Sequence, residues 1–150
     1  RGVAPERMVF APQLTQAEHL ARLQLADLAL DTFPYTSHTT ASDALWAGVP
    51  LVARRGETFA SRVSASILNA AGLPELVSET PESYFQVALD LATGPDRLAR
   101  IRARLAATRM SCALFDSQRF TLDLERLFRR MWTNHRAGTL QPIVLGLHGD

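Results

Sequence analysis

The sequence predicts an α/β fold, a Rossmann-like parallel sheet with helices on both faces. Two observations support this prediction. Short apolar runs of strand length alternate with longer segments in which apolar residues recur at helical spacing. Apolar residues make up 47% of the 150 residues and charged residues 21%, which is enough apolar material for a buried core. Alternating strands and helices are typical of parallel sheets, because each parallel connection needs a crossover.

Four short apolar runs are predicted strands, and they occupy residues 8–11, 28–31, 51–53 and 73–77. Turn-forming residues bound them, such as Pro12 after the first run and Gly72 before the last. In parallel sheets, ligands bind at the loops that leave the carboxyl ends of strands and enter helices. The loops of interest are therefore residues 12–18, 32–40 and 54–58.

Six segments are predicted helices: residues 15–25, 41–47, 59–71, 81–92, 96–108 and 117–135. The last is amphipathic, with Phe120, Leu124 and Leu127 on one face. We assign residues 1–136 to one domain and residues 137–150 to a C-terminal tail. The chain begins with Arg1 rather than Met, which favours a segment of a longer protein whose upstream part is missing.

The composition narrows the classes of partner. A net charge of +1 gives no reason to expect a nucleic acid or an anionic membrane. All 16 basic residues are arginine, so an anion must be bound by guanidinium, imidazole or backbone N–H groups. No apolar run approaches the roughly 20 residues that span a bilayer. Cys112 is the only cysteine, which excludes an internal disulfide and fits a cytoplasmic location.

The most informative segment follows the second predicted strand. His38, Thr39 and Thr40 arrive together at a predicted helix start, where Thr39 or Thr40 is expected to be the cap. The first turn of a helix offers unpaired N–H groups and a positive dipole end, which suit a diphosphate. Asp43 lies about one turn later, where its carboxylate can accept hydrogen bonds from a ribose. An ordinary helix cap has the same residue types, and spacing alone does not separate the two interpretations.

Two other loops carry weaker signals. His19 and Arg22 are expected to share a helix face near its start, either as donors to phosphate or base or as a solvated face. Residues 56–62 form a glycine-containing loop that either lines the sugar side of a site or starts a capped helix. Tyr35 lies in the candidate ligand loop, so it is not assigned to the core.

The chain resembles the O-GlcNAc transferase family of the SPINDLY type. The resemblance is carried by residues 25–28 and 30–32, by the block from His38 to Pro50 (HTTASDALWAGVP) and by GETFASRV at residues 56–63. Residues 111–116 and 120–125 also carry it, and it covers roughly residues 8–135. It implies the C-terminal, nucleotide-sugar-binding half of a GT-B glycosyltransferase. It assigns the UDP contacts to one set of residues: Leu14, Gln16, His19, Arg22, His38, Thr39, Thr40 and Asp43.

The resemblance also implies the role of each position. His38, Thr39 and Thr40 bind the diphosphate and Asp43 the ribose. His19 and Arg22 line the uridine side, and the backbone from Leu14 to Gln16 contacts the uracil. Gln16 stands where animal members of the family carry a lysine, so it brings an amide and no charge.

The implied reaction is metal-independent, inverting transfer of N-acetylglucosamine from UDP-GlcNAc to Ser or Thr hydroxyls, without a cofactor. Its partners are a protein or peptide acceptor and the upstream catalytic half and tetratricopeptide repeats of the same chain. By itself, this segment is expected to bind UDP weakly and to catalyse nothing. Two alternatives stay open: a glycosyltransferase with another donor or acceptor, such as UDP-glucose or Asn, and a non-catalytic nucleotide-binding or interaction module.

Overall fold

A three-stranded parallel sheet in the order β1-β2-β3 forms the centre of the protein in a computed structural model that describes residues 2–139 and 141–144. The strands are β1 (Ala29–Leu30), β2 (Leu51–Arg54) and β3 (Val77–Ser78). Ala29 is in register with Leu51, and Ala53 with Val77. The central strand β2 is buried over its first three residues, as expected for a strand covered on both faces.

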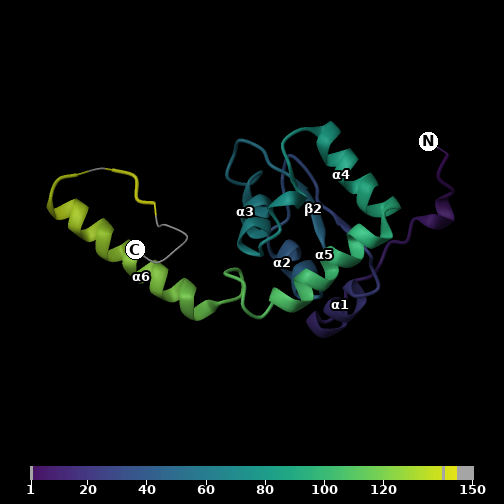
Figure 1. Ribbon diagram of the computed structural model, residues 1–150, viewed down its shortest axis with the longest axis horizontal. Coiled ribbons are helices and arrows are strands. Elements are labelled where there is room, and N and C mark those ends of the chain that lie inside the picture. Colours follow the sequence, from purple (N-terminus) through teal and green to yellow (C-terminus); the bar gives the residue numbers. More distant parts are fainter. Residues whose placement is uncertain (1, 140, 145–150) are drawn as a thin grey trace.

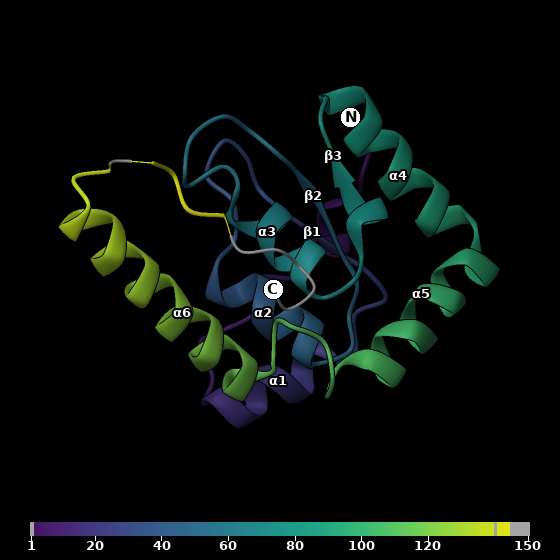
Figure 2. The same ribbon diagram turned by 60° about the vertical axis from the view of Figure 1, so that its left-hand side comes forward.

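Helices cover both faces of the sheet, which confirms the predicted fold class. In Figures 1 and 2, α2 (Thr39–Trp46) and α3 (Val63–Ala70) lie on one side of β2, while α4 (Pro81–Thr93) and α5 (Pro95–Thr108) lie on the other. Both α3 and α4 contact β2 directly, and α5 packs on α4. The first helix, α1 (Gln16–Leu23), packs against α2 and therefore lies beside the start of that helix.

One apolar core joins these layers. Val52 of β2, Leu45 of α2, Leu68 of α3, Leu91 of α4 and Leu105 of α5 are fully buried members of the same cluster. Burial of one such side chain contributes about 1.5 to 3 kcal/mol. The core therefore fixes α2, and with it the candidate diphosphate site, against the sheet.

The predicted first strand is wrong. Residues 8–11 follow a short 3-10 helix, η1 (Pro5–Arg7), and form no strand. Met8, Val9 and Phe10 are 60%, 85% and 87% exposed. A strand needs a neighbouring strand to pair with, and among the described residues β1 pairs only with β2. An apolar run in the sequence does not reveal whether that neighbour is present.

The fourth predicted strand is shorter than expected. Residues Pro74–Leu76 form a second 3-10 helix, η2, and only Val77–Ser78 pair with β2. Pro74 has no backbone N–H to donate to a sheet, and its fixed φ suits the first turn of a helix.

Two helix starts also differ from the prediction. Helix α2 begins at Thr39 with His38 as its N-cap, so neither Thr39 nor Thr40 is the cap. Helix α3 begins at Val63 rather than at residue 59. The residues before it form a closed turn, in which Ser61 N–H donates to the Thr58 carbonyl at 3.2 Å and Thr58 N–H donates to Ser61 Oγ at 2.9 Å.

The last helix, α6 (Ser117–Arg136), stands apart from the sheet and its covering helices in Figures 1 and 2. It is amphipathic as predicted, yet Phe120, Phe128 and Met131 are each more than half exposed. Of the predicted tail, residues 137–139 and 141–144 form no helix or strand, and residues 140 and 145–150 lie outside the described residues. None of the described helices is long and apolar enough to cross a membrane.

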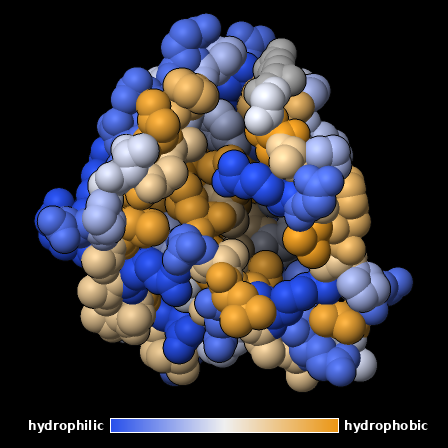
Figure 3. Space-filling model, turned by 90° about the vertical axis from the view of Figure 1, so that its right-hand side faces the viewer, coloured by the Kyte–Doolittle hydropathy of each residue, from blue (hydrophilic) through white to orange (hydrophobic). Residues whose placement is uncertain are grey.

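Apolar surface is also exposed on the side of the molecule that carries the N-terminal segment, α4 and α5 in Figure 1. Figure 3 shows this face with a hollow at its centre, and both apolar and hydrophilic residues border the hollow. Phe85 of α4 is 65% exposed and Leu30 of β1 is 58% exposed. The described part of the chain therefore leaves large apolar side chains exposed outside its two buried clusters.

Candidate functional site

Four of the predicted UDP-binding residues meet where α1 approaches α2. Gln16 Nε2 donates to Asp43 Oδ1 at 3.3 Å, and His19 Nε2 lies 3.9 Å from Asp43 Oδ2. Arg22 Nη2 lies 3.2 Å from His19 Nδ1, and Arg22 Nη1 donates to the Pro12 carbonyl at 2.7 Å. The structure thus brings together Gln16, His19, Arg22 and Asp43, which come from two helices.

The direction of these contacts fixes the tautomer of His19. A guanidinium only donates, so His19 Nδ1 accepts from Arg22 and the ring proton of a neutral His19 lies on Nε2, facing Asp43. The His19 and Asp43 side chains are 27% and 17% exposed, so a ligand can still reach them. Asp43 is consequently held in place as an accessible acceptor, which is what a ribose diol requires.

The start of α1 is set by a capping box. Thr15 Oγ1 accepts from Glu18 N–H at 3.5 Å, and Glu18 Oε2 accepts from Thr15 N–H at 3.1 Å. Hydrogen bonds from the Thr15 hydroxyl and then from its backbone N–H lower the pKa of Glu18. The cap orders the backbone beside Leu14, which is 38% exposed. The predicted uracil contact of this backbone stays a prediction.

The first turn of α2 has unpaired donors. His38 is the N-cap but its side chain makes no cap hydrogen bond, and the first helical bond runs from Ser42 N–H to the His38 carbonyl at 3.3 Å. Within the described chain, the N–H groups of Thr39, Thr40 and Ala41 have no hydrogen-bond acceptor. Free N–H groups and the positive dipole end together make a site for an anion.

His38 is held between two aromatic rings. The Tyr35 ring stacks on it with centroids 5.2 Å apart and planes 16° apart, and the Phe59 ring meets it edge-on at 6.3 Å. His38 Nε2 is buried, with no hydrogen-bond partner in the part of the chain that the structure describes. A buried polar atom without a partner costs free energy. This nitrogen therefore has a hydrogen-bonding capacity that the described chain does not use.

Asp31 organises the loop that leads to His38, and sequence analysis missed it. The residue is 4% exposed, and its Oδ1 accepts from Thr32 N–H at 2.9 Å and from Ser37 N–H at 2.8 Å. Tyr84 of α4 donates to the Asp31 carbonyl at 2.9 Å. Burial, with the Asp31 charge as a smaller cause, raises the pKa of Tyr84. An Asp at a strand end before turn residues was the available signal.

A second set of contacts ties the same loop to α3. Thr36 is 1% exposed, and its N–H and hydroxyl both donate to the Ala60 carbonyl, at 3.1 and 2.7 Å. Ser64 Oγ donates to the Ser37 carbonyl at 2.6 Å. Residues 56–62 therefore support the His38 loop instead of starting a helix. Their predicted place on the sugar side stays a prediction.

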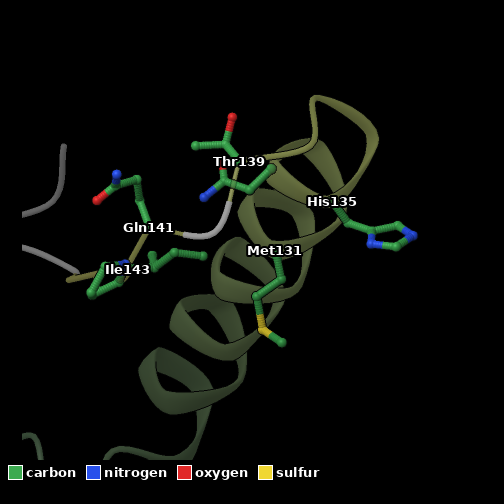
Figure 4. A pocket seen from close by; sticks show the side chains of 7 residues that line it. Met131, His135, Thr139, Gln141 and Ile143 are labelled. Carbon is green, nitrogen blue, oxygen red and sulfur yellow. The ribbon is translucent and has the colours of Figure 1, made fainter.

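A pocket of about 450 Å³ lies between the end of α6 and the following segment, lined by Met131, Asn134, His135, Thr139, Gln141, Pro142 and Ile143 (Figure 4). It contains none of the predicted residues. Among the residues described, no group of three or more His, Cys, Asp or Glu is placed to hold a metal ion.

Comparison with known proteins connects this geometry to a family. The model of glycosyl transferase family 41 matches residues 1–124. The chain is 43% identical over 138 residues to the UDP-N-acetylglucosamine–peptide N-acetylglucosaminyltransferase of Caenorhabditis elegans, covering 92% of the chain but 12% of that protein. It is 34% identical to a probable enzyme of the same name, SPINDLY, of Petunia hybrida, covering 95% of the chain and 15% of that protein.

A solved structure agrees with these relatives. The O-GlcNAc transferase of Thermobaculum terrenum, solved as a mutant, matches with a TM-score of 0.82 and 43% identity. The match covers 88% of this chain and 25% of that one. The chain therefore spans a small part of the proteins that it matches.

Proposed function

The chain belongs to glycosyl transferase family 41, and we propose that it is the UDP-sugar-binding part of a protein O-GlcNAc transferase. The observation that carries the proposal is the start of α2, where unpaired N–H groups lie one turn from the Asp43 carboxylate. One short helix thus presents donors suited to a diphosphate and an acceptor suited to a ribose.

The diphosphate of UDP would lie at the N-terminus of α2. The backbone N–H groups of Thr39 and Thr40 donate to its oxygens, and the two hydroxyls and His38 Nε2 add further bonds. Hydrogen bonds to a charged acceptor are the stronger ones, at about 1.5 to 3 kcal/mol each. This arrangement also favours the charge that develops on UDP as it leaves.

The nucleoside would lie across the junction of α1 and α2. The ribose hydroxyls donate to Asp43, which Gln16 and His19 hold in position. His19 and Arg22 line the uridine side, and the backbone from Leu14 to Gln16 faces the uracil. The contact of Arg22 with the Pro12 carbonyl keeps this backbone close to the helix.

In the whole protein, the proposed reaction moves N-acetylglucosamine from UDP to a Ser or Thr hydroxyl of a protein, with inversion at the anomeric carbon. The bond from that carbon to the phosphate oxygen breaks, the bond to the acceptor oxygen forms, and the hydroxyl proton passes to a base outside this segment. We propose that no metal or cofactor takes part. An upstream catalytic half and tetratricopeptide repeats complete the proposed enzyme, which acts in the cytoplasm.

Calorimetry with UDP on the full-length protein tests the site. Asp43→Ala and His38→Ala should each weaken UDP binding about tenfold, which corresponds to about 1.4 kcal/mol for a lost hydrogen bond. Asp96→Ala, in the first turn of α5, is the matched control and should keep wild-type affinity. Thermal unfolding shows whether each variant is folded. Unchanged affinity in both site variants would remove the assignment.

Turnover assays separate the remaining alternatives. With full-length protein and Ser-containing peptides, UDP-GlcNAc should be used in preference to UDP-glucose. Preference for UDP-glucose, or transfer to Asn, would favour the other glycosyltransferase alternative. UDP binding without any transfer would favour a non-catalytic module.

A further inference from the structure

A second pocket lies at the same edge of the sheet as the candidate diphosphate site. It has a volume of about 420 Å³, and its walls include Phe33, Pro34, Arg54, Arg55, Thr58 and Glu79. Arg54 is the last residue of β2, Phe33 lies in the loop after β1, and Glu79 directly follows β3. The pocket thus opens at the carboxyl ends of the strands, where ligands of parallel sheets bind.

The two arginines of this pocket differ in their partners. Arg55 Nε donates to Glu79 Oε2 at 3.2 Å, so its charge is matched. The guanidinium carbon of Arg54 lies 4.3 Å from the centroid of the Phe33 ring, and no carboxylate among the described residues pairs with it. Stacking on an aromatic ring orients a guanidinium and leaves its N–H donors free. Arg54 is therefore ready to bind an anion, above all a planar carboxylate.

Two segments that line the pocket continue into the His38 site. Phe33 lies two residues before Tyr35, whose ring stacks on His38. Thr58 lies next to Phe59, whose ring meets His38 edge-on. A group bound at Arg54 would consequently lie at the same edge of the sheet as the proposed diphosphate.

The second of these segments is rigid. Gly56 N–H donates to the Ser61 carbonyl at 2.8 Å, and Thr58 N–H donates to Ser61 Oγ at 2.9 Å. A Cβ on Gly56 would approach Ser61 Oγ to 2.4 Å, so Ser61 packs closely against this glycine. The pocket is thus formed before a ligand arrives, which lowers the entropy cost of binding.

We propose that Arg54 binds an acidic side chain of the acceptor protein, an Asp or Glu near the Ser or Thr that receives the sugar. This inference rests on the proposed function. The diphosphate is met by α2, and N-acetylglucosamine carries no charge, so the donor leaves Arg54 unmatched. The acceptor is the other substrate of the proposed reaction. A carboxylate on it would pair with Arg54, which neither Glu57 nor Glu79 of this pocket partners.

The test uses the full-length protein with UDP-GlcNAc and a set of Ser-containing peptides. Asp or Asn is placed at each flanking position in turn, and kcat/KM is compared within each pair. At one flanking position, kcat/KM should be about tenfold higher for the Asp peptide than for the Asn peptide, as expected for a bidentate, charge-assisted contact with Arg54. Arg54→Gln should bring that ratio close to one. Arg100→Gln, an exposed arginine of α5, should keep it.

Three results would overturn the inference and leave the proposed function intact. In the first, the wild type transfers sugar but shows no preference for Asp at any position. In the second, Arg54→Gln lowers the rates of both peptides equally, so the side chain only supports the Phe33 loop. In the third, Arg54 is needed for a donor that carries a carboxylate, tested with UDP-glucuronic acid, and not for acidic peptides. Transfer to no peptide at all would refute the proposed function itself, and the inference with it.

Discussion

Replacing Asp31 tests whether the loop before α2 is held by its buried carboxylate. Asp31 Oδ1 accepts from two backbone N–H groups, those of Thr32 and Ser37, at 2.9 and 2.8 Å. A hydrogen bond to a charged group contributes about 1.5 to 3 kcal/mol. Both bonds are only partly buried, so the lower value applies, and Asp31→Ala should lower the free energy of unfolding by roughly 3 kcal/mol.

Asp31→Asn is the milder change. The amide oxygen still accepts, but neutral bonds are about half as strong. The amide nitrogen would occupy the place of Oδ2, which is buried with no partner among the described residues. We expect a loss of about 2 kcal/mol, from weaker bonds and an unsatisfied donor. Asp27→Asn is the control, because the Asp27 side chain is 90% exposed and 3.8 Å from Arg102, a pair worth less than about 1 kcal/mol.

Asp31→Ala should also weaken UDP binding, because the loop that Asp31 holds positions His38 and the first turn of α2. If the loop opens in the variant, UDP must close it again, and each 1.4 kcal/mol of that cost lowers affinity about tenfold. Urea unfolding and UDP calorimetry on the full-length protein measure both effects. Wild-type stability and affinity in Asp31→Ala would refute the reasoning. Lost stability with wild-type affinity would show that the carboxylate supports the fold but not the site.

Three other predictions follow from single contacts. Thr15→Ala should raise the pKa of Glu18 toward 4.5, and NMR titration of the carboxyl carbon measures this change. Because the folded protein lowers this pKa, Glu18 stabilises the fold above pH 4.5, and the stabilisation is lost as the pH falls through the lowered pKa. In an absorbance titration, Tyr84 should ionise above pH 10.0, and this ionisation should be absent in Tyr84→Phe. The contribution of Tyr84 to the free energy of unfolding is complete below pH 10.0 and is lost as the pH rises through the raised pKa. Gly56→Ala should lower the free energy of unfolding by about 1 to 3 kcal/mol, because the new Cβ would lie 2.4 Å from Ser61 Oγ. Urea unfolding measures this loss, and wild-type stability would show that the turn adjusts easily.

The fold class and most helices could be predicted because their signals are local. Apolar spacing and stop signals such as Gly48 and Gly72 locate α2 and α3, and both glycines adopt the positive φ that a helix end favours. The strand at residues 8–11 could not be judged in this way. An apolar run becomes a strand only beside a paired neighbour, and that neighbour is a property of the tertiary structure.

The site could be predicted only in part. His38, Thr39, Thr40 and Asp43 follow one another on α2, so helix geometry alone groups them. The contact between His19 and Asp43 depends on how α1 packs on α2, which residue spacing does not reveal. His19 was assigned to the same site as Asp43 only through the family resemblance. The supporting residues around the loop escaped notice because a buried Asp or Thr has no sequence period that distinguishes it from a solvated one.

Charge balance at the start of α2 bears on how tightly this segment can hold the proposed UDP. A helix N-terminus carries about half a positive charge, whereas UDP leaves with at least two negative charges. The chain contains no lysine, and Arg22 is already bonded to Pro12 and His19. The hydrogen bonds at α2 orient the diphosphate but neutralise little of its charge. Arg54, which has no carboxylate partner among the described residues, is assigned above to the acceptor. With Arg54 so assigned, a cation from outside this segment would meet the departing phosphate in the proposed enzyme, so UDP should bind this segment more weakly than the whole protein.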